Sequence, residues 1–240
     1  MKCAVVTGST KGIGLAIAAD LLRRGCFVVL NYSTSEDAAD QAKRELSQIS
    51  NHFCIIKADL SCHEGLESFS SQLAKISNTI DYLILNVGLT QRVAFSDITR
   101  AAWDTVINAN LTIPFFLIQN VAGAINDHGR IILIGSILGK LPHAISIPYS
   151  VSKAGLNMLA KCLVKEFSAR SITVNVVSPG FTNTSWHASK DVAHLDRIID
   201  KISLNRLAEP HEISSTCMHL IDNGYINGQV ITVDGGYDYR

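Results

Sequence analysis

Short apolar runs alternate along the chain with longer segments in which apolar residues recur every three or four positions. The runs are almost continuously apolar, which is typical of parallel strands covered on both faces, and the longer segments have the period of amphipathic helices. Strands are predicted at Cys3–Thr7, Phe27–Asn31, Phe53–Lys57, Tyr82–Asn86, Arg130–Gly135, Thr173–Ser178 and Val230–Val233. Helices are predicted at Leu15–Arg24, Glu36–Ile49, Glu64–Ile76, Ala101–Ile125 and Ser150–Ala169.

This alternation of strand and helix predicts the fold class. Parallel strands joined by helical crossovers form a doubly wound sheet, so we expect one Rossmann-type α/β domain over residues 1–240, with a seven-stranded parallel sheet flanked by helices. No linker or internal repeat divides the sequence. Only Phe181–Arg206 departs from the rhythm. It is a long insertion between the last two strands, and we predict that it covers a substrate site.

Composition narrows the class of partner. Hydrophobic residues make up 47% of the chain, and 21 Lys and Arg balance 21 Asp and Glu, so neither nucleic acid nor a polycation is an expected partner. A neutral, apolar-rich chain favours self-association as a dimer or tetramer. With no leader-like start and no membrane-length apolar stretch, a cytoplasmic protein is expected. The six cysteines lack zinc-ligand spacing, so no metal site is expected.

A glycine-rich turn follows the first predicted strand and opens the first helix. The sequence Gly8-Ser9-Thr10-Lys11-Gly12-Ile13-Gly14 has the spacing GxxxGxG. Glycines let the backbone turn tightly and approach a pyrophosphate, while the helix N-terminus presents free N–H groups. The turn therefore indicates a dinucleotide site, although a tight turn without a ligand has the same pattern.

Tyr149 and Lys153 are four residues apart in a predicted helix and so share a face. A free tyrosine has a pKa near about 10, and a nearby ammonium favours its phenolate form. Such a tyrosine exchanges a proton with an alkoxide or an alcohol. Ser136, at the end of the fifth strand, is placed to hydrogen-bond a substrate oxygen. Alone, the tyrosine–lysine pair is also compatible with a routine helix face.

Several motifs occur in the order and spacing of one family. They are the glycine turn, Asn86-Val87-Gly88, Asn110-Leu111, Ser136, Tyr149-x-x-x-Lys153 and Ser178-Pro179-Gly180. Together they resemble the short-chain dehydrogenases/reductases over the whole chain, and residues 28–39 and 172–181 look most like the 3-oxoacyl-acyl-carrier-protein reductases. This resemblance implies an oxidoreductase that moves a hydride between nicotinamide and a carbonyl/alcohol pair.

The resemblance also implies the roles of individual residues. Tyr149 would be the proton donor, Ser136 would orient the substrate, Lys153 would bind the nicotinamide ribose, and Asn110 would hold a water of a proton relay. Most relatives have alanine where this chain has Val87, which adds modest bulk. The cofactor would contact Gly8, Ser9, Thr10, Lys11, Gly12, Ile13, Gly14, Tyr32, Ser33, Thr34, Asp59, Leu60, Asn86, Val87, Gly88, Tyr149, Lys153, Pro179, Gly180, Thr182 and Thr184. Asp59 is also a candidate helix cap, and Thr182 and Thr184 are candidate ordinary loop residues.

The end of the second strand favours NADP(H) over NAD(H). A carboxylate there would accept hydrogen bonds from the ribose 2′-OH of NAD, but the strand ends without an acid before Glu36. A 2′-phosphate would instead meet the hydroxyls of Ser33 and Thr34 and the ammonium of Lys11. A solvated loop lysine is the alternative for Lys11.

The expected substrate is a ketone in a mostly apolar pocket. Substrate contacts are predicted for Ser136, Leu138, His143 and Trp186, and the pocket wall for Ile137, Leu141, Ile145, Ile147, Leu89, Gln91 and His187. A 3-oxoacyl thioester is the leading expectation, and a free hydrophobic ketone such as a steroid or quinone is the alternative. Arg170 matches a basic position for an acidic carrier protein, whereas Asp127 would repel one. A non-catalytic NADP-binding regulator is the remote alternative.

Overall fold

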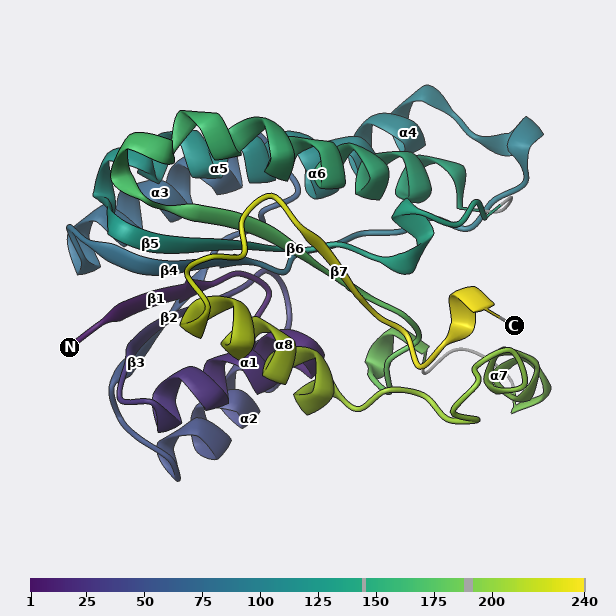
Figure 1. Cartoon of the computed structure of the whole chain (residues 1–240), viewed down its shortest axis with the longest axis horizontal. Helices are drawn as coiled ribbons and strands as arrows, with labels where there is room; N and C mark the ends of the chain where they lie inside the picture. Colours follow the sequence, from purple (N-terminus) through teal and green to yellow (C-terminus); the bar gives the residue numbers. More distant parts are fainter. Residues whose placement is uncertain (144–145, 188–191, 240) are drawn as a thin grey trace.

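The computed structural model describes residues 1–143, 146–187 and 192–239, and its centre is one seven-stranded sheet (Figure 1). All neighbouring strands pair in parallel, in the order β3-β2-β1-β4-β5-β6-β7. This arrangement confirms the predicted fold class. The strands are β1 (Cys3–Val6), β2 (Phe27–Tyr32), β3 (Phe53–Lys57), β4 (Ile80–Leu85), β5 (Ile125–Ile134), β6 (Thr173–Pro179) and β7 (Val230–Val233).

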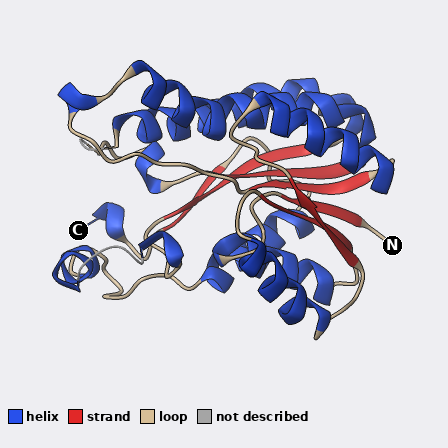
Figure 2. Cartoon of the chain, turned by 180° about the vertical axis from the view of Figure 1, so that it is seen from behind, coloured by secondary structure: helices blue, strands red, loops and turns tan. Residues whose placement is uncertain are grey.

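Helices cover both faces of the sheet, as Figures 1 and 2 show. Successive strand residues point to opposite faces, so Val5 enters one hydrophobic core and Val6 the other. The first core lies under α3, α5 and α6, and the second under α1 and α8. The helices are α1 (Gly12–Arg23), α2 (Glu36–Ser47), α3 (His63–Ile76), α4 (Arg100–Ile107), α5 (Ile113–Val121), α6 (Ile147–Glu166), α7 (Val192–Ile199) and α8 (Pro210–Asp222).

The prediction of one unbroken helix over Ala101–Ile125 was wrong. A π-helical turn at Asn108–Thr112 separates α4 from α5, and the Ile113 N–H donates to the Asn108 carbonyl. Pro114 has no N–H to donate to the carbonyl of residue 110, four positions earlier, so the regular ladder cannot continue there. Asn110, one of the predicted catalytic residues, lies in this wider turn.

The same helix also ends earlier than predicted, because Ile125 begins β5. Ile125 pairs with Ile80 and Arg130 pairs with Tyr82, so β5 has extra residues between these two positions. His128 adopts a left-handed backbone with φ 62° in this irregular stretch. A bulge of this kind hides the strand pattern, which explains why the sequence indicated a start at Arg130.

The helical stretch Arg100–Ala124 is long and apolar enough to cross a membrane by length and composition. In the structure, apolar side chains of this stretch pack in the core of the domain. Leu117, Ile118 and Val121 are buried in the core between α5 and the sheet. The stretch therefore behaves as a core element of the domain.

The site lies where the sheet changes direction. The strands after β1 run outward through β2 to β3, whereas β4 pairs with the other side of β1. Loops that leave the carboxyl ends of β1 and β4 diverge and open a crevice at this switch point. The predicted insertion Phe181–Arg206 contributes a short 3-10 helix (Ser185–His187) and α7 beside it (Figure 1).

Candidate active site

The glycine turn joins β1 directly to α1. Gly8 and Gly12 have φ values of +58° and +55°, a backbone conformation that residues other than glycine rarely adopt. A Cβ on Gly14 would lie 2.5 Å from the Gly8 carbonyl oxygen, so only glycine fits there. No side chain caps the start of α1. The free N–H groups of its first turn therefore remain for a phosphate group.

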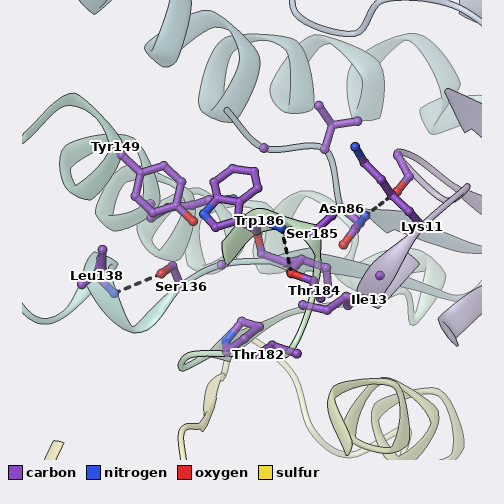
Figure 3. Close-up of a pocket in the computed structure, with 18 of the residues that line it drawn as sticks. Lys11, Ile13, Asn86, Ser136, Leu138, Tyr149, Thr182, Thr184, Ser185 and Trp186 are labelled. Atoms are coloured by element: carbon purple, nitrogen blue, oxygen red, sulfur yellow. Dashed lines mark hydrogen bonds between the residues drawn. The ribbon is translucent and has the colours of Figure 1, made fainter. Parts of the chain in front are cut away.

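Two asparagines hold this turn in place. Asn86 Nδ2 donates to the Gly8 carbonyl at 2.8 Å (Figure 3) and to the Thr7 carbonyl at 3.2 Å. Asn31 is buried in β2, where its Oδ1 accepts from the Gly8 N–H at 3.2 Å and its Nδ2 donates to the Ala58 carbonyl at 3.0 Å. This role of Asn31 was not expected from the sequence. The feature of the sequence that could have indicated it is an asparagine within an otherwise apolar strand.

Ser136, Tyr149 and Lys153 come together at the carboxyl end of β5. Tyr149 lies in the first turn of α6, and Lys153 follows one turn later on the same face. Lys153 Nζ lies 5.7 Å from the centroid of the Tyr149 ring and donates to the Ile134 carbonyl at 2.7 Å. The Ser136 Oγ accepts from the Leu138 N–H at 3.2 Å (Figure 3).

The protein raises the pKa of Tyr149 above its usual value of 10.0. Burial is the largest cause, and it outweighs a hydrogen bond with Ser136 and the positive charge of Arg92, which both lower this pKa. In the protein alone, desolvation of the phenolate outweighs the nearby positive charge of Arg92. The expected effect of the Lys153 ammonium stays a prediction. A protonated phenol is the form that donates a proton.

Burial has the opposite effect on Lys153, because it disfavours a charged amine. The side chain is 2% exposed, and its pKa falls from 10.5 to about 8. Among the described residues its hydrogen-bond partner is a backbone carbonyl and not a carboxylate, which makes the buried charge costly for stability. Such a group is characteristic of functional sites.

Asn110 organises the loop after β4 rather than facing the cavity. Its Oδ1 accepts from the Leu89 N–H at 2.8 Å, and its Nδ2 donates to the Leu89 carbonyl at 2.8 Å and to Ser152 Oγ at 3.0 Å. Ser152 in turn donates to the Tyr149 carbonyl at 2.7 Å. The side chain thus links the π turn to the first turn of α6. Ser152, between the tyrosine and the lysine, was not singled out from the sequence.

The adenosine end of the cavity is only partly as expected. Lys11, Ser33, Asp59 and Leu60 line it, whereas Tyr32 and Thr34 do not. The hydroxyl of Tyr32 donates to Glu36 at 2.6 Å, and Lys57 pairs with the same carboxylate. Asp59 does not cap the following helix, since its Oδ1 accepts from the N–H and hydroxyl of Ser61.

The loop after β6 closes the other side of the cavity. Thr182 and Thr184 line it, and Thr184 lies against the glycine turn, 3.1 Å from a Cβ placed on Gly12. Trp186 stands over the catalytic group with its ring centroid 6.3 Å from that of Tyr149 (Figure 3). Leu138 also lines the cavity, and so does Arg92, which was not among the residues predicted from the sequence.

Some predicted residues are not brought to the cavity. Ser9 and Thr10 are buried inside the glycine turn, and His143 is not among the lining residues. Of the predicted pocket wall, Ile137 lines the cavity, whereas Leu89, Gln91, Leu141 and Ile147 do not. Ile145 and the side chain of His187 lie outside the described part of the chain.

The cavity fits an extended dinucleotide followed by a small substrate. Its volume is about 490 Å³, and it runs from Lys11 and Asp59 past Gly88 to Tyr149. A Cβ on Gly88 would lie 3.7 Å from Lys153 Nζ, so the backbone there approaches the catalytic lysine closely. The strained glycines, the uncapped helix start and the long crevice together match the requirements of a nicotinamide dinucleotide.

Comparisons with known proteins agree with this geometry. The family model for short chain dehydrogenase matches residues 2–194. The acetoacetyl-CoA reductase of Shinella zoogloeoides is 34% identical and covers 98% of both chains. The 3-oxoacyl-[acyl-carrier-protein] reductase of Aquifex aeolicus is 31% identical over 98% of this chain and 96% of its own. Among solved structures, the angucycline C-6 ketoreductase LanV with bound NADP has a TM-score of 0.92 at 27% identity, over 98% of this chain and 95% of its own.

The chain therefore belongs to the short-chain dehydrogenase/reductase family, which confirms the resemblance seen in its motifs. It is an oxidoreductase that acts on carbonyl and hydroxyl groups.

Proposed function

We propose that the protein reduces a ketone to a secondary alcohol with NADPH. The observation that carries this proposal is the convergence of Ser136, Tyr149 and Lys153 at one end of a crevice whose other end is the glycine turn. When bound, the dinucleotide would supply the hydride. The glycine turn, Asn86 and Gly88 would hold it along the crevice, and Thr182 and Thr184 would lie beside the nicotinamide.

The protein's own groups would handle the proton and the geometry. Ser136 and Tyr149 would hydrogen-bond the carbonyl oxygen, and Tyr149 would donate its hydroxyl proton as the alkoxide forms. The raised pKa of Tyr149 keeps that proton on the phenol before reaction. Lys153 would bind ribose hydroxyls and return a proton to Tyr149. The Asn110 carbonyl, to which Pro114 cannot donate, would hold the relay water.

NADPH is expected to bind more tightly than NADH by about 1–3 kcal/mol, the range of a charge-assisted hydrogen bond. Lys11 and Ser33 line the adenosine end, while the nearest acid of this segment, Glu36, binds Tyr32 and Lys57. Titration of both cofactors measures the difference. Lys11→Ala should abolish most of it, whereas the matched Lys43→Ala on α2 should not. Equal dissociation constants in the wild type would refute the preference.

The ketone would belong to one of two substrate classes, a 3-oxoacyl thioester or a free hydrophobic ketone. A 3-oxoacyl thioester is favoured by the acetoacetyl-CoA and 3-oxoacyl reductases among the relatives. A free ketone is favoured by Arg170 and Asp127, the two positions considered for docking of an acidic carrier protein. Arg170 binds Asp127 at 2.9 Å and the Ala122 carbonyl at 2.8 Å, so its charge is already used. Asp127 lies near the amino end of β5 and Arg170 just before β6, so both are at the edge of the sheet opposite Tyr149.

Turnover with a substrate panel tests the proposed function. The panel contains a 3-oxoacyl group on an acyl carrier protein, the same group on coenzyme A, and free cyclic and aryl ketones. Consumption of NADPH with any of these ketones supports ketoreduction, and comparison of the arms separates the two classes. Absence of turnover with every ketone, including the oxo acids described in the next section, would contradict the proposal and favour a non-catalytic NADP-binding regulator.

We propose further that the protein is a homo-oligomer built on α4, α5 and α6. Phe116 on α5 and Met158 on α6 are 42% and 58% exposed, which is unusual for large apolar side chains. Light scattering at micromolar concentration is expected to give a dimer or tetramer mass. Phe116→Asp together with Met158→Asp should lower that mass, and a wild-type monomer would contradict the interface.

The remaining expectations concern location and the insertion. All six cysteines are free thiols, which fits the reducing cytoplasm that we propose.

We also propose that residues 181–206 cover the substrate, because Thr184 and Trp186 from this segment already border the cavity beside Tyr149.

A further inference from the structure

Arg92 is the arginine that lines the active-site cavity, and among the described residues it forms no ion pair with a carboxylate. It lies in the loop after β4, is exposed, and lines the active-site cavity with Ser136, Tyr149 and Trp186. Within the described ranges, no ion pair to Arg92 is formed, whereas other guanidinium groups bind acidic side chains: Arg23, Arg24, Arg100, Arg170 and Arg206. A planar guanidinium with free N–H groups is suited to a carboxylate.

The charges around the cavity are distributed unevenly. Among its described lining residues the only carboxylate is Asp59, at the adenosine end, where it binds Ser61. The catalytic end contains two cations, Arg92 and Lys153, and no acid among the described residues that line it. Lys153 is buried and donates to a backbone carbonyl, so Arg92 is the cation that a substrate can reach. The positive charge of Arg92 also acts on the reacting hydroxyl, because it is one of the effects that lower the pKa of Tyr149 against the larger effect of burial.

We propose that the physiological substrate is an oxo acid, a ketone that also carries a carboxylate, and that Arg92 binds this carboxylate while Ser136 and Tyr149 hold the carbonyl oxygen. The inference rests on the proposed ketoreduction and specifies its substrate class. Arg92 borders the same cavity as Tyr149 and its charge acts on the Tyr149 hydroxyl, so one small molecule would present its carboxylate to Arg92 and its ketone to Tyr149. The apolar side chains of Ile137, Leu138 and Trp186 would contact the carbon skeleton between or beside these two groups.

A thioester places its charge differently. Its acyl group is neutral beside the ketone, and the phosphates of coenzyme A or of a carrier are separated from it by the long pantetheine arm. An anion recognised close to the ketone therefore distinguishes a free oxo acid from both thioester forms.

The test compares each oxo acid with its own methyl ester, which removes the charge and little else. Pairs with two to five carbons between ketone and carboxylate are assayed with saturating NADPH, together with the coenzyme A thioesters and neutral aryl ketones. For at least one pair we expect the wild type to favour the acid in kcat/KM by about 10-fold or more, the range of a charge-assisted hydrogen bond. Arg92→Gln should remove this preference through a higher KM for the acid, and Arg92→Lys should retain part of it.

Two controls make the result specific. Arg100→Gln removes a nearby exposed arginine that pairs with Asp104 outside the cavity, so the preference should persist. The dissociation constant of NADPH should be unchanged in Arg92→Gln. If it weakens strongly while the acid preference stays, Arg92 binds the cofactor and the inference is overturned.

Preference for esters, thioesters or neutral ketones over every acid in the wild type would also overturn the oxo-acid proposal while leaving ketoreduction intact. If no ketone in the panel is reduced, the proposed function itself fails.

Discussion

Replacing Tyr149 with phenylalanine is expected to lower the single-turnover rate of ketone reduction by about 10²–10⁴, the range of general acid–base catalysis. The substitution keeps the aromatic ring beside Trp186 and removes only the hydroxyl that would protonate the alkoxide. NADPH binding should therefore survive. Stopped-flow measurement of NADPH oxidation, with saturating cofactor and a ketone that the wild type reduces, determines the rate.

Tyr32→Phe is the matched control for this substitution. Tyr32 lies near the adenosine end, but its hydroxyl donates to Glu36 and it does not line the cavity. Its loss should leave the rate of hydride transfer nearly unchanged. A rate within a few-fold of wild type in Tyr149→Phe would show that the proton comes from elsewhere.

Replacing Lys153 with methionine is expected to damage both cofactor binding and turnover. The ammonium would bind the nicotinamide ribose and resupply the proton of Tyr149, so both the dissociation constant of NADPH and the single-turnover rate should worsen. In combination with Tyr149→Phe, the loss of turnover should be much smaller than the product of the two separate losses, because groups that act as a unit are not additive. Fully multiplicative losses would contradict a joint role.

Lys153→Met also has a signed effect on stability. The native pKa of about 8 lies below the ordinary 10.5, so the cost of burying the charged amine is fully present below pH 8 and disappears as the pH rises towards 10.5. This cost corresponds to about 3 kcal/mol at most. The unfolding free energy of the variant relative to wild type should thus fall between pH 7.5 and pH 10, as urea denaturation can measure. A constant difference over this range would contradict the lowered pKa.

The sheet and the glycine turn could be predicted from the sequence because their signals are local. Near-continuous apolar strands separated by amphipathic segments allow few arrangements other than a doubly wound sheet, and the glycines of the first turn are required by backbone conformation. The four-residue spacing of Tyr149 and Lys153 likewise places both side chains on one helix face, since helical residues four apart are neighbours.

Other features depend on contacts between distant segments. The π turn around Asn110 follows from Pro114, a signal that the apolar pattern of the helix concealed. The pKa of Tyr149 could not be derived from its neighbours in the chain, because burial by several elements outweighs them. Arg170 and Asp127 were considered separately, as a docking cation and a repelling acid, but they form an ion pair with each other.

The path of the loop after β4 decides the role of Arg92. Nothing in its local sequence separates it from a solvated surface arginine, whereas the structure shows it on the wall of the same cavity as Tyr149. Similarly, Tyr32 and Thr34 follow directly on β2 but turn away from the cavity that Ser33 lines. Residues next to one another at the end of a strand point in different directions, so proximity in sequence did not determine contact.

Transfer of deuterium from the cofactor to the product tests the central claim most directly. A ketone that the enzyme consumes is reduced with NADPH stereospecifically deuterated at C4 of the nicotinamide, with each of the two epimers in turn, and the alcohol is analysed by mass spectrometry. We predict one deuterium on the carbinol carbon with one epimer and none with the other, in the wild type and, more slowly, in Tyr149→Phe. An alcohol without deuterium from either epimer would contradict hydride transfer from the nicotinamide at this site.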